Sequence, residues 1–155
     1  MAHVRTQIRE AFKDALEAAV GAAGYTVFAS RKYSVNVDDG RGYVDIMVGN
    51  DQTEVARSTI GSTRKARIHT ASVYIRVQRS AFSEALDDEL DADEVFVVGA
   101  VHDYDWVELL EEEPELLQVN FVDANDSRGV AVGTIVIRFD VEYRINYDAP
   151  ETVID

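Results

Sequence analysis

Two stretches in which apolar and polar residues alternate constrain the fold of this chain more than any other feature. In residues 134–145 the apolar members are Ile135, Ile137, Phe139, Val141, Tyr143 and Ile145. Within residues 64–79, a second alternating set consists of Ala71, Val73, Ile75 and Val77 against Thr70, Ser72, Tyr74 and Arg76. Successive side chains of a strand point to opposite faces, so each stretch predicts a long strand with one apolar face on a core. Together they indicate a sheet with one covered side.

Two helical patterns could supply that cover. Residues 4–22 carry a single apolar stripe at three- and four-residue spacing, formed by Val4, Ile8, Phe12, Ala15, Leu16, Ala19 and Val20. A second helix is predicted to start at Ser80, from the helical pattern of residues 80–90 and from the spacing of Phe82, Leu86, Leu90, Val97 and Val101. Residues 95–98 (VFVV) also fit a strand, and periodicity does not decide between the two.

The remaining segments predict short strands at 25–29, 43–48, 53–60 and 116–122, a turn at 49–52 and a short helix at 105–110. A chain of 155 residues fits one domain with its own core. We therefore expect a single α+β domain over residues 1–148, with a mixed or antiparallel β-sheet and helices packed on one face. Residues 149–155 are expected to form a flexible C-terminal tail.

Charge is divided sharply along the chain. Between residues 55 and 79 there are six bases and no acid: Arg57, Arg64, Lys65, Arg67, Arg76 and Arg79. From residue 80 to 126 the acids follow one another without a Lys or Arg. One folded domain should then have a basic and an acidic region, which can pair head to tail between copies and form rings or filaments. The alternative is an ordinary solvated surface with uneven charge.

We take the residues on both sides of this division as candidates for protein interfaces. Arg57, Arg64, Lys65 and Arg67 are the first choice, because no acid nearby in the sequence offsets them. The other candidates are Arg76, Arg79, Glu84, Asp87 and Asp88. Residues 55–65 are small, polar and basic, which is typical of a hairpin or loop that orders against a partner.

The overall composition disfavours several classes of function. A net charge of -14 opposes bulk attraction to DNA or to an anionic membrane, although a negative wall would suit a conduit through which DNA passes without sticking. The chain has no Cys, hence no disulfide framework or thiolate chemistry. It shows no signal-peptide core and no apolar run of the roughly 20 residues that a membrane span needs. We expect a soluble protein made in a cytoplasm.

Catalytic and metal-binding motifs are incomplete in this sequence. His3, His69 and His102 are far apart and lack ligand spacing. Residues 123–127 (DANDS) resemble the start of a calcium loop, but Arg128 replaces its glycine. Residues 61–65 (GSTRK) lack the spacing of a P-loop, and nothing orients the acids of residues 87–91 for acid–base work. We predict no catalytic residue, no cofactor and no metal.

Several short motifs, taken in order along the chain, resemble one protein family. These are residues 3–9 (HVRTQIR), residues 27–33 (VFASRKY), the long middle strand leading into a helix, and residues 138–144 (RFDVEYR) followed by Pro150 and Glu151. They resemble the tail terminator, or tail completion, proteins of phages with long non-contractile tails and of related gene transfer agents. The resemblance covers most of the chain.

The resemblance implies a small structural subunit that forms a homohexameric ring. Such a ring caps the tail tube protein, ends tube polymerisation and offers a docking surface to the head connector or stopper protein, while DNA passes through its bore. It implies assembly in the host cytoplasm and a final location at the tail–head junction of the virion, without a membrane partner. The alternatives are another neck or tail-completion adaptor, a small ligand-binding or acid–base α+β enzyme, and a DNA-binding protein that uses the basic strand.

Overall fold

The computed structural model describes residues 3–20, 26–28, 43–55, 66–82, 86–125, 130–146 and 149–153. In chain order its elements are α1 (Val4–Val20), β1 (Thr26–Phe28), β2 (Tyr43–Val55), β3 (Ala66–Phe82), α2 (Leu86–Asp103), β4 (Glu115–Asn125), β5 (Val130–Asn146) and β6 (Ala149–Val153). The predicted loop or hairpin at 55–65 lies outside the described residues beyond Val55.

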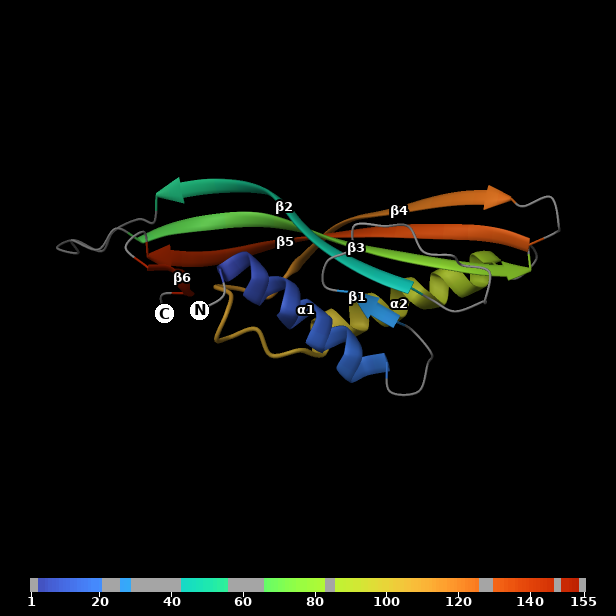
Figure 1. The fold of residues 1–155 in the computed structure, drawn as a ribbon, viewed down its shortest axis with the longest axis horizontal. Helices are drawn as coiled ribbons and strands as arrows, with labels where there is room; N and C mark the ends of the chain where they lie inside the picture. Colours follow the sequence, from blue (N-terminus) through green and yellow to red (C-terminus); the bar gives the residue numbers. More distant parts are fainter. Residues whose placement is uncertain are drawn as a thin grey trace.

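The strands form one twisted sheet, and both helices lie on the same side of it (Figure 1). The strand order is β1-β2-β3-β5-β4, with β6 pairing on β5. Only the β1–β2 pair is parallel; the other pairs are antiparallel. The predicted α+β class, with a mixed sheet and helices on one face, is confirmed. The β6 strand lies within residues 149–155, for which the sequence predicts a flexible tail.

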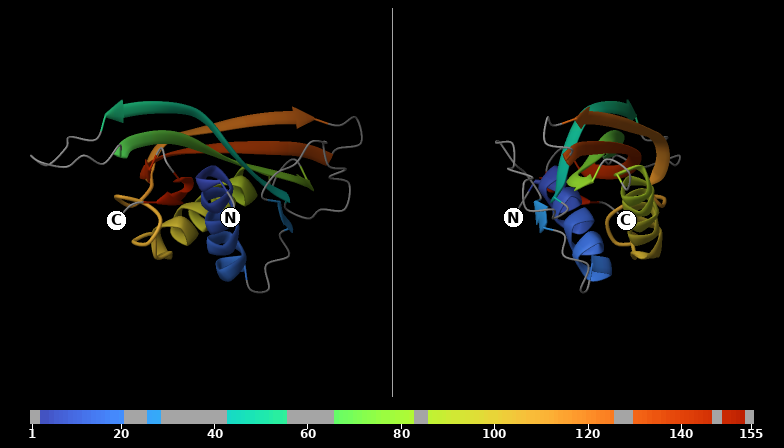
Figure 2. Two further views of the ribbon diagram at one scale, coloured as in Figure 1. Left: turned by 60° about the vertical axis from the view of Figure 1, so that its left-hand side comes forward. Right: turned by 90° about the vertical axis from the view of Figure 1, so that its right-hand side faces the viewer.

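The core lies between the sheet and the two helices (Figure 2). From α1 it receives the fully buried side chains of the predicted stripe, among them Ile8 and Phe12. The apolar sets of both alternating strands are buried against them: Ala71, Val73, Ile75, Val77, Ile135, Ile137, Phe139, Val141 and Tyr143. Residues 95–98 belong to α2, so the helical alternative was right there. None of the described helices is long and apolar enough to cross a membrane.

Three element boundaries differ from the local sequence patterns. The turn predicted at residues 49–52 is a register shift within the continuous strand β2, because β3 pairs with β2 on both sides of it. The predicted helix that starts at Ser80 starts later, since residues 80–82 continue β3 and pair with β5. The short helix predicted at 105–110 is a turn in which Leu109 and Leu110 donate backbone hydrogen bonds to the Trp106 carbonyl. Tertiary pairing overrides local preference at the first two sites.

The contact between α2 and β5 requires a glycine. A Cβ on Gly133 would lie 2.6 Å from Leu90 Cδ1 and 3.0 Å from Leu86 Cδ1, and both leucines are buried. We expect Gly133→Ala to lower the free energy of unfolding by about 1–3 kcal/mol through overpacking. Gly99→Ala in α2 is the matched control: a Cβ there meets nothing within 4 Å. Because alanine favours a helix, this control should raise stability by about 0.5–1 kcal/mol. Urea unfolding measures both; equal effects would contradict the close packing at Gly133.

Candidate interaction surfaces

Arg79 and the acidic helix pair with each other inside one chain. Arg79 Nε lies 2.6 Å from Asp93 Oδ2, and Arg79 Nη2 lies 2.6 Å from Asp93 Oδ1, which is a bidentate ion pair. Arg79 Nη1 also contacts Glu89. The Asp93 side chain is completely buried, and that of Arg79 is 13% exposed. Arg79, which was predicted as an interface candidate, lies between β3 and α2.

Arg76 is likewise engaged within the chain. It donates from Nη2 to Asp45 Oδ2 at 2.5 Å and from Nε to the same oxygen at 3.2 Å, which joins β3 to β2. The Asp45 side chain is only 3% exposed, although it lies on the sheet face opposite the helices. Part of the predicted complementarity between bases and acids is therefore satisfied inside the subunit, where it stabilises the sheet and its cover.

The remaining predicted interface residues fall into three groups. Arg67 lies in β3 opposite Ile145, and its side chain is outside the described residues. Asp87 and Asp88 are exposed in the first turn of α2, where acids favour the positive end of the helix dipole. The third group, Arg57, Arg64, Lys65 and Glu84, lies outside the described residues. The structure does not bring the described candidates together into one patch.

The uncovered face of the sheet carries a polar network across β3 and β5. Ser72 donates to Asp140 at 3.0 Å, and Arg138 donates to the same carboxylate oxygen at 3.3 Å. The Arg138 guanidinium lies 5.9 Å from the centre of the Tyr74 ring. Asp140 therefore links β5 to β3 through Ser72, while its ion pair with Arg138 lies within β5.

The edge strand β4 exposes apolar side chains, a feature that the sequence reasoning missed. Leu116, Leu117 and Phe121 are 41%, 45% and 49% exposed. Over the described residues, β4 pairs only with β5, so its other side faces outward. Free edges in natural proteins are normally short or protected by Lys or Pro, because their unpaired backbone groups attract other strands. This edge is 11 residues long and contains neither. The apolar run in 116–122 was a signal, but only the strand order reveals that it lies at an edge.

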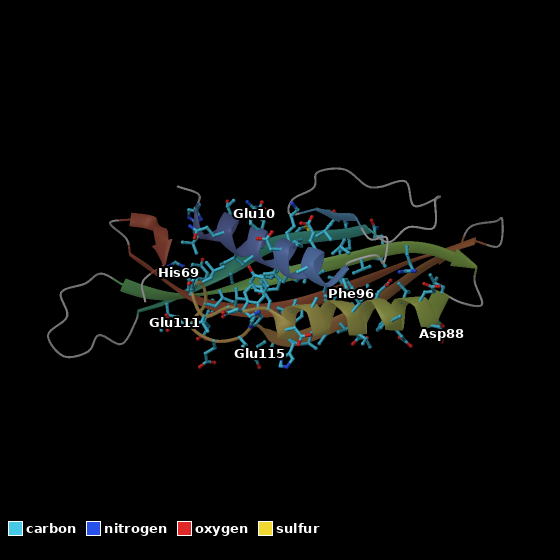
Figure 3. The ribbon with its side chains drawn as sticks, turned by 90° about the horizontal axis from the view of Figure 1, so that it is seen from below. Glu10, His69, Asp88, Phe96, Glu111 and Glu115 are labelled. Atoms are coloured by element: carbon cyan, nitrogen blue, oxygen red, sulfur yellow. The ribbon has the colours of Figure 1, made fainter. Side chains whose placement is uncertain are left out.

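Acidic side chains precede that edge in the chain, in the segment that leads from α2 into β4. Figure 3 shows Asp88 at one end of α2, with Glu111 and Glu115 beyond its other end. The exposed acids between α2 and the start of β4 are Asp103, Asp105, Glu108, Glu111, Glu112, Glu113 and Glu115. The backbone of Glu111 donates to the Glu142 carbonyl at 2.9 Å, which fixes this acidic segment against β5. The strand β4, with its exposed apolar side chains, therefore begins directly after an exposed acidic segment.

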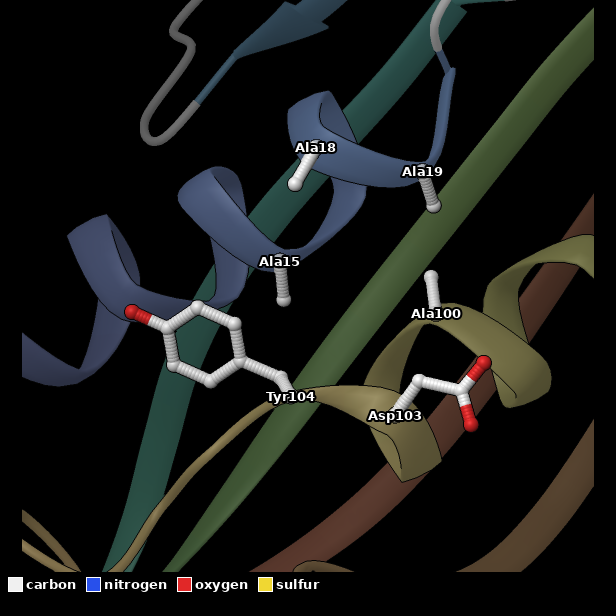
Figure 4. A pocket seen from close by; sticks show the side chains of 6 residues that line it. All are labelled: Ala15, Ala18, Ala19, Ala100, Asp103 and Tyr104. Atoms are coloured by element: carbon white, nitrogen blue, oxygen red, sulfur yellow. The ribbon is translucent and has the colours of Figure 1, made fainter.

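A hollow of about 250 Å³ lies between the two helices and is lined mainly by alanines (Figure 4). Asp103 and Tyr104 are its polar members. Burial, together with the nearby carboxylates of Asp14 and Asp105, raises the pKa of Tyr104, which keeps its hydroxyl protonated. A catalytic pocket needs several convergent polar groups, and these two do not provide a nucleophile with an oriented base. Within the described part of the chain, no three His, Cys, Asp or Glu residues gather as a metal site.

Comparisons with known proteins found similarity to a solved structure and no matching family. No family model matches the sequence, and no curated protein matches it either. Among solved structures, one similar chain comes from the "Virion of native gene transfer agent (GTA) particle". The two chains share 19% sequence identity with a TM-score of 0.36, and the match covers 87% of this chain and 94% of that one. Similarity at this level does not establish a shared function.

Proposed function

We propose that this protein is a structural virion protein that assembles into a homohexameric ring at the tail–head junction. The ring caps the tail tube, ends tube polymerisation and presents a surface to the head connector or stopper protein, and it performs no catalysis. The proposal rests on the resemblance of residues 3–9, 27–33 and 138–144 to tail terminators. The single structural observation that supports it is the apolar outer edge of β4.

A long edge strand that contains neither Lys nor Pro favours assembly over an isolated existence. Burying apolar surface contributes about 25 cal/mol per Å², and each strand added to an edge also pairs backbone groups that otherwise face water. The half-exposed Leu116, Leu117 and Phe121 would gain from both effects when a second strand covers them. A subunit that exists mainly in an assembly has no need of the Lys or Pro that would protect this edge.

The acidic helix layer fits a channel that does not retain DNA. The α2 helix carries seven acids and no Lys or Arg: Asp87, Asp88, Glu89, Asp91, Asp93, Glu94 and Asp103. Only Asp93 among them is buried. Phosphate is repelled by such a surface at distances up to about 8 Å at physiological salt. DNA would therefore pass a ring of these subunits without the tight binding that a basic channel would impose.

A tube-capping assay tests the proposal. The tail tube protein encoded with this chain is polymerised in its presence and absence, and tube lengths are measured by negative-stain imaging. We expect shorter tubes of uniform length that carry a ring at one end. Tubes of unchanged length without rings would contradict capping. A chain that leaves the tubes unchanged but binds the head stopper protein would instead be a neck adaptor.

We expect Arg64→Glu with Lys65→Glu to abolish both ring formation and tube capping, because these bases lack an acid nearby in the sequence and are proposed to contact an acidic partner. Arg64→Lys with Lys65→Arg is the matched control; it retains both positive charges and should assemble normally. Native mass and the tube-length assay measure the two outcomes. Normal assembly of the charge-reversed variant would show that Arg64 and Lys65 do not contribute to the interface.

A further inference from the structure

Among the described residues, two long segments of the sheet have no strand on their outer side, and they lie at opposite corners. On one side, β1 pairs only with Tyr43, Val44 and Asp45, so residues 46–55 of β2 have no described strand on their outer side. On the other side, the outer edge is β4. The rest of β5 beyond β4 is occupied, first by the backbone of Glu111 and then by β6. Within the described parts of β2 and β4, the two free segments, which have no described strand on their outer side, are therefore residues 46–55 and 115–125.

The registers show that these two segments are staggered along the sheet. Residues 46–55 of β2 lie alongside residues 67–75 of β3. The β4 strand pairs with residues 131–140 of β5, which lie alongside residues 72–81 of β3. Since β2 runs antiparallel to β3 and β4 runs in the same direction as β3, β2 and β4 point in opposite directions. A second copy placed beside the first in the same orientation would thus bring β2 next to β4 as an antiparallel pair, with residues 46–49 of β2 at the level of residues 115–119 of β4.

The charges of the helix layer decide between the possible partners of β4. The α2 helix packs on β5 and β3, toward the β4 edge, whereas α1 packs on β1 and β2 (Figure 2, right). If β4 paired with β4 of another copy, a two-fold axis perpendicular to the sheet would place the two acidic α2 helices side by side. If β4 paired with β2 of another copy, α2 would instead face α1. That helix has three bases, Arg5, Arg9 and Lys13, and three acids, so the repulsion is removed.

We propose that the outer edge of β4 in one copy pairs antiparallel with residues 46–55 of β2 in the next copy, so that one sheet continues from subunit to subunit. This inference rests on the proposed ring and names its subunit contact. The contact is heterologous, because two different edges meet, and a heterologous contact closes into a ring when the rotation between neighbours is a whole fraction of a full turn. It covers Leu116, Leu117 and Phe121, and it places the exposed Met47 of β2 at the same junction.

Cysteine cross-linking tests this contact directly, since the chain has no Cys of its own. Met47 and Asn120 are exposed, and their strand positions place them on the uncovered face of the sheet, away from the helices. Met47→Cys and Asn120→Cys proteins of different tagged mass are mixed and treated with a short bis-maleimide. We expect cross-links between the two variants and none within either alone. A chain carrying both substitutions should give a ladder that ends at the ring.

Three other results of the cross-linking and native-mass experiments would contradict the proposed contact, and each points to a different explanation. Cross-linking of Asn120→Cys with itself would show that β4 pairs with β4. Rings seen by native mass without the Met47–Asn120 cross-link would leave the proposed function intact and place the contact elsewhere. A protein that stays monomeric at every concentration and gives no cross-link would overturn both the contact and the ring.

A substitution on the edge provides an independent test. Phe121→Lys introduces the residue that most often protects free edges, and we expect self-association to weaken at least about tenfold. Charge alone would have the opposite effect: the added positive charge lowers the repulsion between copies of net charge -14 and so favours association. Val107→Lys is the matched control: it adds the same charge at a side chain that is 82% exposed in the turn before β4. Sedimentation velocity measures both, and equal association of the two variants would contradict the contact.

Discussion

Arg79→Ala is expected to lower the free energy of unfolding by about 3–5 kcal/mol, the largest effect of any single charge removal in the described structure. The change leaves Asp93, which is completely buried, without the guanidinium that holds both of its carboxylate oxygens. For a chain of this size, that loss corresponds to a fall in the melting temperature of about 10 °C. Thermal and urea unfolding, followed by circular dichroism, measure it.

Two further variants distinguish the loss of the ion pair in Arg79→Ala from the loss of side-chain volume. Arg79→Met combined with Asp93→Leu removes both charges and keeps the volume, so most of the stability should return. Lys13→Ala removes an exposed helix ion pair, Lys13 with Glu17 at 3.6 Å, and should change stability by less than about 0.5 kcal/mol. If Arg79→Ala were as mild as Lys13→Ala, the bidentate pair would not anchor α2 to the sheet.

Phe12→Ala is expected to destabilise the protein by about 3–5 kcal/mol. Phe12 of α1 is fully buried and joins three parts of the fold. Its ring centre lies 4.6 Å from that of Trp106, after α2, and 6.0 Å from that of Phe139 in β5. Truncation leaves a cavity where α1, the turn after α2 and the sheet meet, and such a cavity cannot collapse without moving all three.

Trp106 reports on this cavity because it is the only tryptophan in the chain. It is buried, and its indole Nε1 donates to the Val101 carbonyl at 2.8 Å. In Phe12→Ala we expect its fluorescence to shift toward that of a solvated indole at lower urea concentrations. Glu10→Ala, an exposed position on the same helix, is the control and should remain within about 0.5 kcal/mol. Equal midpoints for the two variants would contradict the role of Phe12 in the core.

The alternating patterns predicted the central strands and their buried faces because burial on one side of a sheet imposes a two-residue period. The stripe of α1 was predicted for the corresponding reason in a helix. Residues 49–52 and 80–82 were assigned wrongly because their neighbours in the sheet decide their conformation. A Gly-Asn-Asp segment favours a turn locally, yet β3 pairs with β2 on both sides of it.

The candidate surfaces were harder to predict than the fold. Charge along the sequence indicated a basic and an acidic region, but it could not show that Arg79 pairs with Asp93, since that contact depends on how α2 lies on β3. The exposure of Leu116, Leu117 and Phe121 likewise follows from the position of β4 at the end of the strand order. Strand order is a property of the whole fold, whereas the sequence pattern of a strand reports only its own two faces.

The proposed function depends on assembly into a closed ring, which native mass combined with negative-stain imaging of the purified protein can detect. The measurement is made at high concentration, with and without magnesium to lower the repulsion between acidic subunits, and again in the presence of tail tube ends. We expect a closed ring of six copies in at least one of these conditions. A monomer in all of them would contradict it.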